Sequence, residues 1–154
     1  MMAEHMTRTV QPARAYDAAR RRRADLLRAI NGFEHALAAP AAAPTWRSRV
    51  GDQLAALRQQ LTEHITVTEG ADGLYAELLE YAPRLTRQVA GLVGDHTALR
   101  QQMESLANWL RDPATGVEEL RGRATDLLVM LAGHRQRGAD LVYEAYATDI
   151  GGET

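Results

Sequence analysis

The sequence contains no cysteine and no lysine, and phenylalanine occurs only once. Without cysteine, the chain can form neither disulfides nor thiolate metal sites. It also has no run of about 18 apolar residues, the length that a membrane-spanning helix needs. The first residues, MMAEHMTRTVQPARAY, lack the apolar core of a signal peptide. We therefore expect a cytoplasmic protein with no membrane partner.

The charged residues nearly balance, because 18 arginines face 20 acidic residues and give a net charge of −2. This balance argues against a nucleic-acid-binding protein, which would carry a basic surplus. The first 60 residues hold ten arginines and five acidic residues, whereas the remainder of the chain is acidic. We expect helices of opposite charge to pack side by side. No catalytic Ser/His/Asp set and no phosphate-binding loop is recognisable.

Apolar residues recur every three or four positions through most of the chain, which is the period of amphipathic helices. This pattern predicts long helices at about 13–38, 46–64, 83–111 and 115–146, with a short helical segment at 71–82. Short turns separate the long helices, so consecutive helices should run antiparallel. The sequence therefore predicts an all-α fold, an antiparallel up-down four-helix bundle.

The ends of the chain lose this apolar period. We expect a flexible N-terminal arm at residues 1–11, the bundle at 12–147 and a C-terminal tail at 148–154. Thr115 and Glu118 have the spacing of a capping box, which should open the last long helix.

Three of the predicted helices carry a histidine on the buried apolar stripe: His64, His96 and His134. Counted from the turn that their two helices share, His64 and His96 differ by about four residues, and so do His96 and His134, a mismatch of about 6 Å in each pair. The three rings should therefore share one layer of the bundle. A buried imidazole needs a hydrogen-bond partner or a metal ion, so the pattern predicts a metal site or a histidine-based polar network. The alternative is three core histidines that are satisfied separately.

Arg23 occupies the corresponding level of the first helix, where a fourth histidine would complete the layer. The four consecutive arginines 20–23 turn through about 400° on a helix, so at least one must face inward, and the apolar spacing indicates Arg23. His35 lies on the opposite side of this helix and about 18 Å from the layer, so it would reach the site only through a kink. His5 should lie on the surface of the arm.

Metal sites in helical bundles also use carboxylates. Glu69 would turn inward if its helix loosens before Gly70, and we predict it as a ligand. Asp140 and Glu144 need a larger distortion of the last helix. They are candidates for an extra ligand or, like Arg23, for a residue that supports the ligands. Otherwise each acid is solvated or pairs with Arg23.

The segments EHITVTEG, DHTALR and GHRQRGADLVYEAY contain the three histidines, and at these segments the chain resembles the hemerythrin-like, HHE cation-binding family. The resemblance covers about residues 15–147. It implies a four-helix bundle whose histidines and carboxylates hold a non-haem di-iron centre. The chain departs from the family pattern at Arg23, where the first helix usually supplies a histidine. It departs again at Gly138 and Ala139, where the fourth helix usually supplies an acid.

The predicted ligand set is His64, Glu69, His96 and His134. Neutral imidazoles with a carboxylate suit iron or zinc better than calcium or magnesium, and the resemblance implies iron. The resulting hypothesis is a non-haem iron domain, with a di-iron or degenerate site, that binds or senses O₂, peroxide or NO. Weak peroxidase- or catalase-like turnover at this centre is a further interpretation. The alternative is a metal-free bundle, with Arg23 paired to an acid, that acts as a protein-interaction or stress-associated module.

Overall fold

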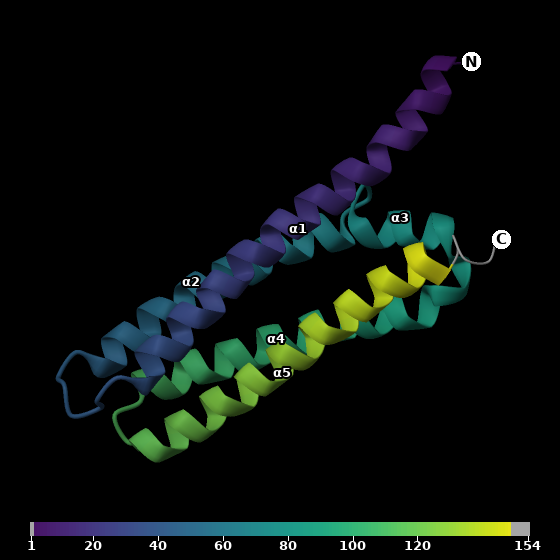
Figure 1. The fold of residues 1–154 in the computed structure, drawn as a ribbon. Coiled ribbons are helices and arrows are strands. Elements are labelled where there is room, and N and C mark those ends of the chain that lie inside the picture. Colours follow the sequence, from purple (N-terminus) through teal and green to yellow (C-terminus); the bar gives the residue numbers. More distant parts are fainter. Residues whose placement is uncertain (1, 149–154) are drawn as a thin grey trace.

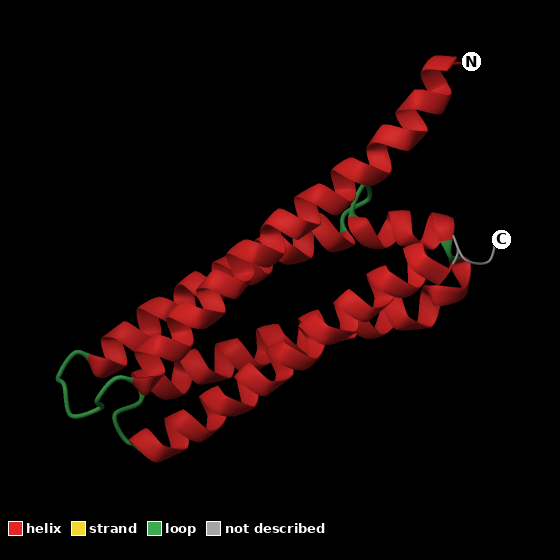
Figure 2. Ribbon diagram, in the orientation of Figure 1, coloured by secondary structure: helices red, strands yellow, loops and turns green. Residues whose placement is uncertain are grey.

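The computed structural model describes the backbone of residues 2–148 and the side chains of residues 14–146. Its elements are α1 (Met2–Ala38), α2 (Trp46–Glu69), α3 (Leu74–Tyr81), the 3₁₀ helix η1 (Pro83–Leu85), α4 (Thr86–Arg111), α5 (Val117–Tyr143) and the π-helical turn η2 (Glu144–Thr148). This described part of the chain contains no strand (Figure 2).

The four long helices form two antiparallel hairpins that pack against each other (Figure 1). One hairpin pairs α1 with α2, and the other pairs α4 with α5. The short helix α3 and η1 connect the two hairpins at the end of the bundle where α5 finishes. This arrangement confirms the predicted all-α, up-down four-helix bundle.

Two helices are longer than the apolar pattern predicted. α1 begins at Met2 rather than near Ala13, and α2 continues to Glu69 rather than ending near His64. Of the predicted tail, residues 149–154 lie outside the described part of the chain. The division into arm, bundle and tail therefore stays a prediction.

The start of α5 differs from the prediction. Gly116 precedes the helix in an extended conformation, and no side chain caps the first turn. The predicted capping box of Thr115 and Glu118 is therefore wrong. Thr115 is instead buried, and its carbonyl oxygen accepts a hydrogen bond from Arg47 of α2, which joins the two turns at this end of the bundle.

A tight turn joins α2 to α3. A Cβ atom added to Gly73 would lie 2.8–2.9 Å from the carbonyl oxygens of Val67, Thr68 and Gly70. Because backbone atoms cannot accommodate so close a contact, glycine is required at this position. The turn thereby determines where Tyr75, in the first turn of α3, meets the rest of the bundle.

Two hydrophobic clusters fill the interior. The larger cluster joins all four long helices, and the smaller one packs α3 and η1 against parts of α1, α4 and α5. Along α4, His96 lies between Leu92 of the smaller cluster and Leu99 of the larger one. A fully buried leucine contributes about 1.5–3 kcal/mol relative to an exposed one. Apolar packing on both sides therefore offsets the cost of burying polar rings between the clusters.

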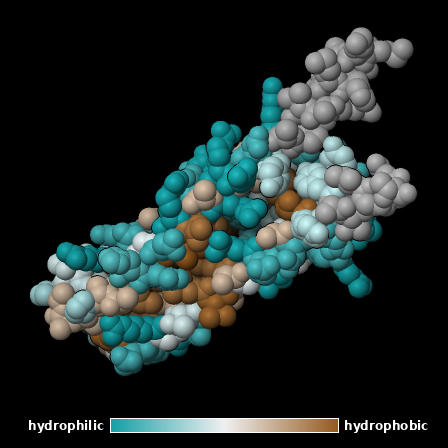
Figure 3. Space-filling model, in the orientation of Figure 1, coloured by the Kyte–Doolittle hydropathy of each residue, from teal (hydrophilic) through white to brown (hydrophobic). Residues whose placement is uncertain are grey.

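Hydrophilic residues cover most of the face seen in Figure 3, and hydrophobic residues are visible mainly along the seam between the hairpins. The large hydrophobic side chains that are exposed in the described region are Tyr81, Val129 and Tyr143. None of the helices within residues 2–148 combines the length and the apolar character that crossing a bilayer requires.

Candidate metal centre

Three imidazole rings meet inside the bundle, one each from α2, α4 and α5. The ring centroids of His64, His96 and His134 lie 4.7–5.6 Å apart. All three residues are buried, and each offers a ligand atom within 4.8 Å of the others. The predicted histidine layer is therefore present, and such a cluster of nitrogen atoms is a candidate metal site.

The three rings direct the same kind of atom, Nε2, toward one another. His134 Nε2 lies 3.1 Å from His96 Nε2 and 3.4 Å from His64 Nε2. Two nitrogen atoms that bind one ion tetrahedrally, each at about 2.1 Å, lie about 3.4 Å apart. These two separations are close to the one that a single metal ion requires.

Glu69, the last residue of α2, holds the opposite side of the His96 ring. Its Oε2 lies 2.5 Å from His96 Nδ1. α2 does not loosen before Gly70, because it stays helical through Glu69, and the carboxylate reaches across to α4. In this position Glu69 orients a histidine and does not face the centre of the cluster.

Asp95, which the sequence pattern did not indicate, holds His134 in the same way. Its Oδ2 accepts hydrogen bonds from His134 Nδ1 at 2.9 Å and from the Arg137 guanidinium at 2.9–3.1 Å. Burial would raise the pKa of Asp95, but these hydrogen bonds outweigh burial and lower it. The position of Asp95 directly before His96 could have predicted this contact. Consecutive helical residues lie about 100° apart, so an acid next to an inward-facing histidine can point toward the neighbouring helix.

The two carboxylates determine which ring nitrogens carry protons. Because Glu69 and Asp95 accept hydrogen bonds at Nδ1, we assign His96 and His134 as Nδ1–H tautomers, with lone pairs on their Nε2 atoms. These lone pairs face each other across 3.1 Å. A positive charge between them, either a metal ion or a proton, would remove their repulsion.

His64 differs from the other two histidines, because its buried Nδ1 has no hydrogen-bond partner among the described residues. Burial, reinforced by the nearby His96, His134 and Arg23, lowers the pKa of His64 to about 3. Burial also lowers the pKa of His96 and of His134, although their carboxylate partners oppose it. All three rings are therefore neutral near pH 7, the form in which imidazole binds metal.

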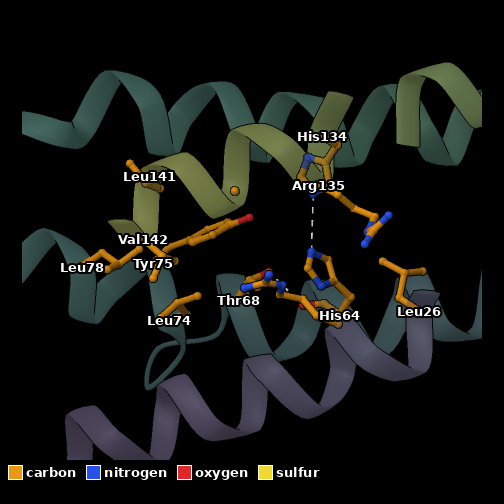
Figure 4. Close-up of a pocket in the computed structure, with 12 residues that line it drawn as sticks. Leu26, His64, Thr68, Leu74, Tyr75, Leu78, His134, Arg135, Leu141 and Val142 are labelled. Carbon is orange, nitrogen blue, oxygen red and sulfur yellow. Dashed lines mark hydrogen bonds between the residues drawn. The ribbon is translucent and has the colours of Figure 1, made fainter. Parts of the chain in front are cut away.

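A cavity of about 30 Å³ lies beside the cluster, lined by residues of α1, α2, α3 and α5. Figure 4 shows the Tyr75 ring extending into this space, toward His64 and His134. Tyr75 also stacks on His96, with ring planes 14° apart. Burial raises the pKa of Tyr75, so the phenol stays protonated. Since a water molecule needs about 10–15 Å³ by this measure, the cavity has room for a ligand of only a few atoms.

The other predicted residues have different positions. Arg23 lines the cavity and is half-buried. Asp140 and Glu144 are exposed, and Asp140 accepts a hydrogen bond from Gln136 on its own helix. Asp140 is not brought to the histidines because α5 stays helical there, and Glu144, the first residue of the π-helical turn η2, remains exposed as well. His35 is also exposed, far from the layer as its position in the sequence predicted.

Comparison with known proteins gives a match to a family model. The model of the hemerythrin HHE cation binding domain matches residues 14–146. This range contains the three histidines and both carboxylates that hold them. Comparison with curated proteins and with solved structures gave no match.

Proposed function

The chain belongs to the hemerythrin HHE cation binding domain family, and we propose that it binds one divalent metal ion through the Nε2 atoms of His64, His96 and His134. The observation that carries this proposal is the convergence of the Nε2 atoms, two of which present lone pairs to each other at 3.1 Å. Because all three rings are neutral near pH 7, protons do not compete with the metal.

The arrangement supports one ion better than a di-iron pair. A pair of metal ions needs carboxylates directed between them. Here Glu69 and Asp95 bind the Nδ1 atoms, on the outer side of the rings. Such carboxylates orient their histidines and increase the basicity of the ligand nitrogens. Fe(II) is the ion we propose, in line with the family, and zinc is the alternative that three imidazoles also accept.

Three histidines leave an open position on the ion, and the neighbouring cavity is where a small ligand would enter. A bound iron ion would supply reversible binding or redox chemistry toward O₂, peroxide or NO. The protein contributes the enclosure: the Tyr75 ring and the apolar side chains of Leu74 and Leu78 line the cavity and exclude bulk water. Weak peroxidase- or catalase-like turnover is the enzymatic form of the same proposal.

Metal analysis tests the proposal directly. Protein purified without a His tag should be stripped with a chelator, reconstituted with Fe(II) or Zn(II) and freed of excess metal. We expect about one ion per chain and a raised melting temperature, because a ligand that binds the folded state stabilises it. Two ions per chain would instead indicate a di-iron centre. The absence of bound metal, with an unchanged melting temperature, would refute metal binding.

A metal-free polar layer is the second candidate, and the placement of His64 is what favours it. His64 Nε2 lies 3.4 Å from His134 Nε2, so a proton on His64 Nε2 can bridge the two rings without any ion. The domain would then act through a partner, as an interaction or stress-associated module. Under this alternative, iron and zinc leave the melting temperature unchanged.

A further inference from the structure

The cavity beside the histidines is lined by two guanidinium groups, Arg23 of α1 and Arg135 of α5, and no carboxylate is among its described lining residues. In Figure 4, Arg135 extends from α5 toward Leu26 of α1. The remaining wall is largely apolar. Positive charge therefore faces a small, mostly apolar space.

Neither arginine has a carboxylate partner within the described residues. The contrast with the adjacent Arg22 is direct, since the Arg22 guanidinium lies 2.5 Å from a carboxylate oxygen of Glu63. Arg23 is close enough to His64 to contribute to the lowering of its pKa. A guanidinium that faces a partly desolvated site without an acid leaves hydrogen-bond donors free for a ligand.

The charged groups around the histidine layer also leave a surplus of positive charge on the cavity side. Glu69 and Asp95 lie on the outer side of the rings, and Arg137 already pairs with Asp95. Arg23 and Arg135 add positive charge on the cavity side, and a divalent ion at the histidines would add more. A dication beside uncompensated guanidinium groups is costly unless an anion lies between them.

We propose that this cavity binds a small planar oxyanion of the size of formate, with Arg23 and Arg135 as the residues that select it. The guanidinium presents a planar fork of N–H donors that matches a carboxylate. The cavity of about 30 Å³ limits the ligand to a few non-hydrogen atoms. This inference rests on the proposed metal site in one respect only, since a bound metal ion would strengthen the attraction for the anion. The two arginines attract the anion whether or not a metal ion is bound.

Formate is the probe, and formamide, a neutral molecule of the same shape, is its control. Binding should be measured by calorimetry and by melting temperature on both the zinc-loaded and the metal-free protein. Gluconate, an anion too large for the cavity, keeps the ionic strength constant. We expect formate to bind and stabilise both forms, more strongly with zinc, and formamide to do neither.

Variants then assign the binding to the cavity. Arg23→Gln should weaken formate binding at least about tenfold, as expected for loss of a hydrogen bond to a charged group. Arg135→Gln should weaken it as well, and Arg23→Lys should retain part of it. Arg21→Gln removes the same charge from an exposed position on α1 and should leave formate binding unchanged.

Two results would overturn the inference: no effect of formate on either form, or an equal formate affinity in wild type and Arg23→Gln. The metal content of every sample is measured in parallel. A wild-type protein that takes up no zinc contradicts the proposed metal site, and formate binding to the metal-free protein then decides the anion site alone. Unchanged zinc content in Arg23→Gln, with formate binding lost, separates the two roles.

Discussion

The two sides of the histidine layer are built differently. On the outer side, Glu69 and Asp95 each hold one ring through Nδ1, so the orientation and tautomer of His96 and His134 are determined. On the cavity side, His64 has no partner at Nδ1 among the described residues, and the charged side chains that line the cavity are arginines. One side of the layer fixes the ligand atoms, and the other leaves space and positive charge beside them.

This difference teaches how a bundle can keep a polar layer and still leave a place for a ligand. The rings with carboxylate partners have their Nδ1 atoms satisfied from outside the cluster. On the cavity side, the buried Nδ1 of His64 lacks a hydrogen bond among the described residues, which is unfavourable, and the His64 ring remains neutral. We expect substitutions on the two sides to have separable effects, one on metal affinity and the other on ligand binding.

The largest effect should come from removing a ligand atom of the layer. His96→Ala should abolish stoichiometric metal binding, because only two imidazoles remain and Glu69 loses its partner. His35→Ala, a histidine-to-alanine change at an exposed position on α1, should leave the metal content unchanged. Metal per chain, with circular dichroism to verify folding, is the measurement. Equal losses in both variants would show that the histidine layer is not the site.

Low pH should destabilise the metal-free protein mainly because His64, on the cavity side of the layer, is neutral in the folded state. The pKa of His64 falls from about 6.5 in the unfolded chain to about 3 in the folded protein. Between these values the unfolded state binds the extra proton. The free energy of unfolding should therefore fall by up to about 1.4 kcal/mol for each pH unit below about 6.5, and this loss is absent above it.

Denaturant titrations at a series of pH values, with chelator present, give this slope. His64→Leu should reduce the slope more than His134→Leu does, because the Asp95 carboxylate opposes the lowering of the pKa of His134. A slope that is the same in wild type and His64→Leu would contradict the assignment of His64 as a neutral buried ring.

A smaller effect should follow from weakening the carboxylate side. Asp95→Asn should lower metal affinity by about 10- to 100-fold without abolishing binding, because an amide no longer fixes the His134 tautomer as a carboxylate does. Glu69→Gln should act in the same direction. Affinity is measured by competition with a chelator. Asp140→Asn is the matched control on the exposed face of α5, and an equal loss there would indicate a general effect of charge.

The fold and the histidine layer could be predicted because both depend on periodicity. The apolar spacing of three and four residues located the long helices, and counting from the turns placed His64, His96 and His134 at one level, where the structure has them. The same spacing indicated Arg23, which lines the cavity. These inferences needed only the rise and rotation of a regular helix.

The groups around the rings could not be predicted in this way. The sequence indicates Asp140 and Glu144 because they follow His134 along the chain, whereas the observed partners of the histidines come from neighbouring helices. His134 of α5 is held by Asp95 of α4, and His96 of α4 by Glu69 of α2. Such pairs depend on the distance and rotation between helices, which a single sequence does not specify.

The turn before α3 limits how this site can be modified. Gly73 tolerates no side chain, because carbonyl oxygens of the preceding residues pack closely around it, so the stretch between His64 and Tyr75 has little room for change. Insertions or deletions in it would displace the aromatic wall from the imidazoles. Altered ligand preference, whether by divergence or by engineering, is therefore more accessible through single exchanges along the cavity wall than through loop remodelling.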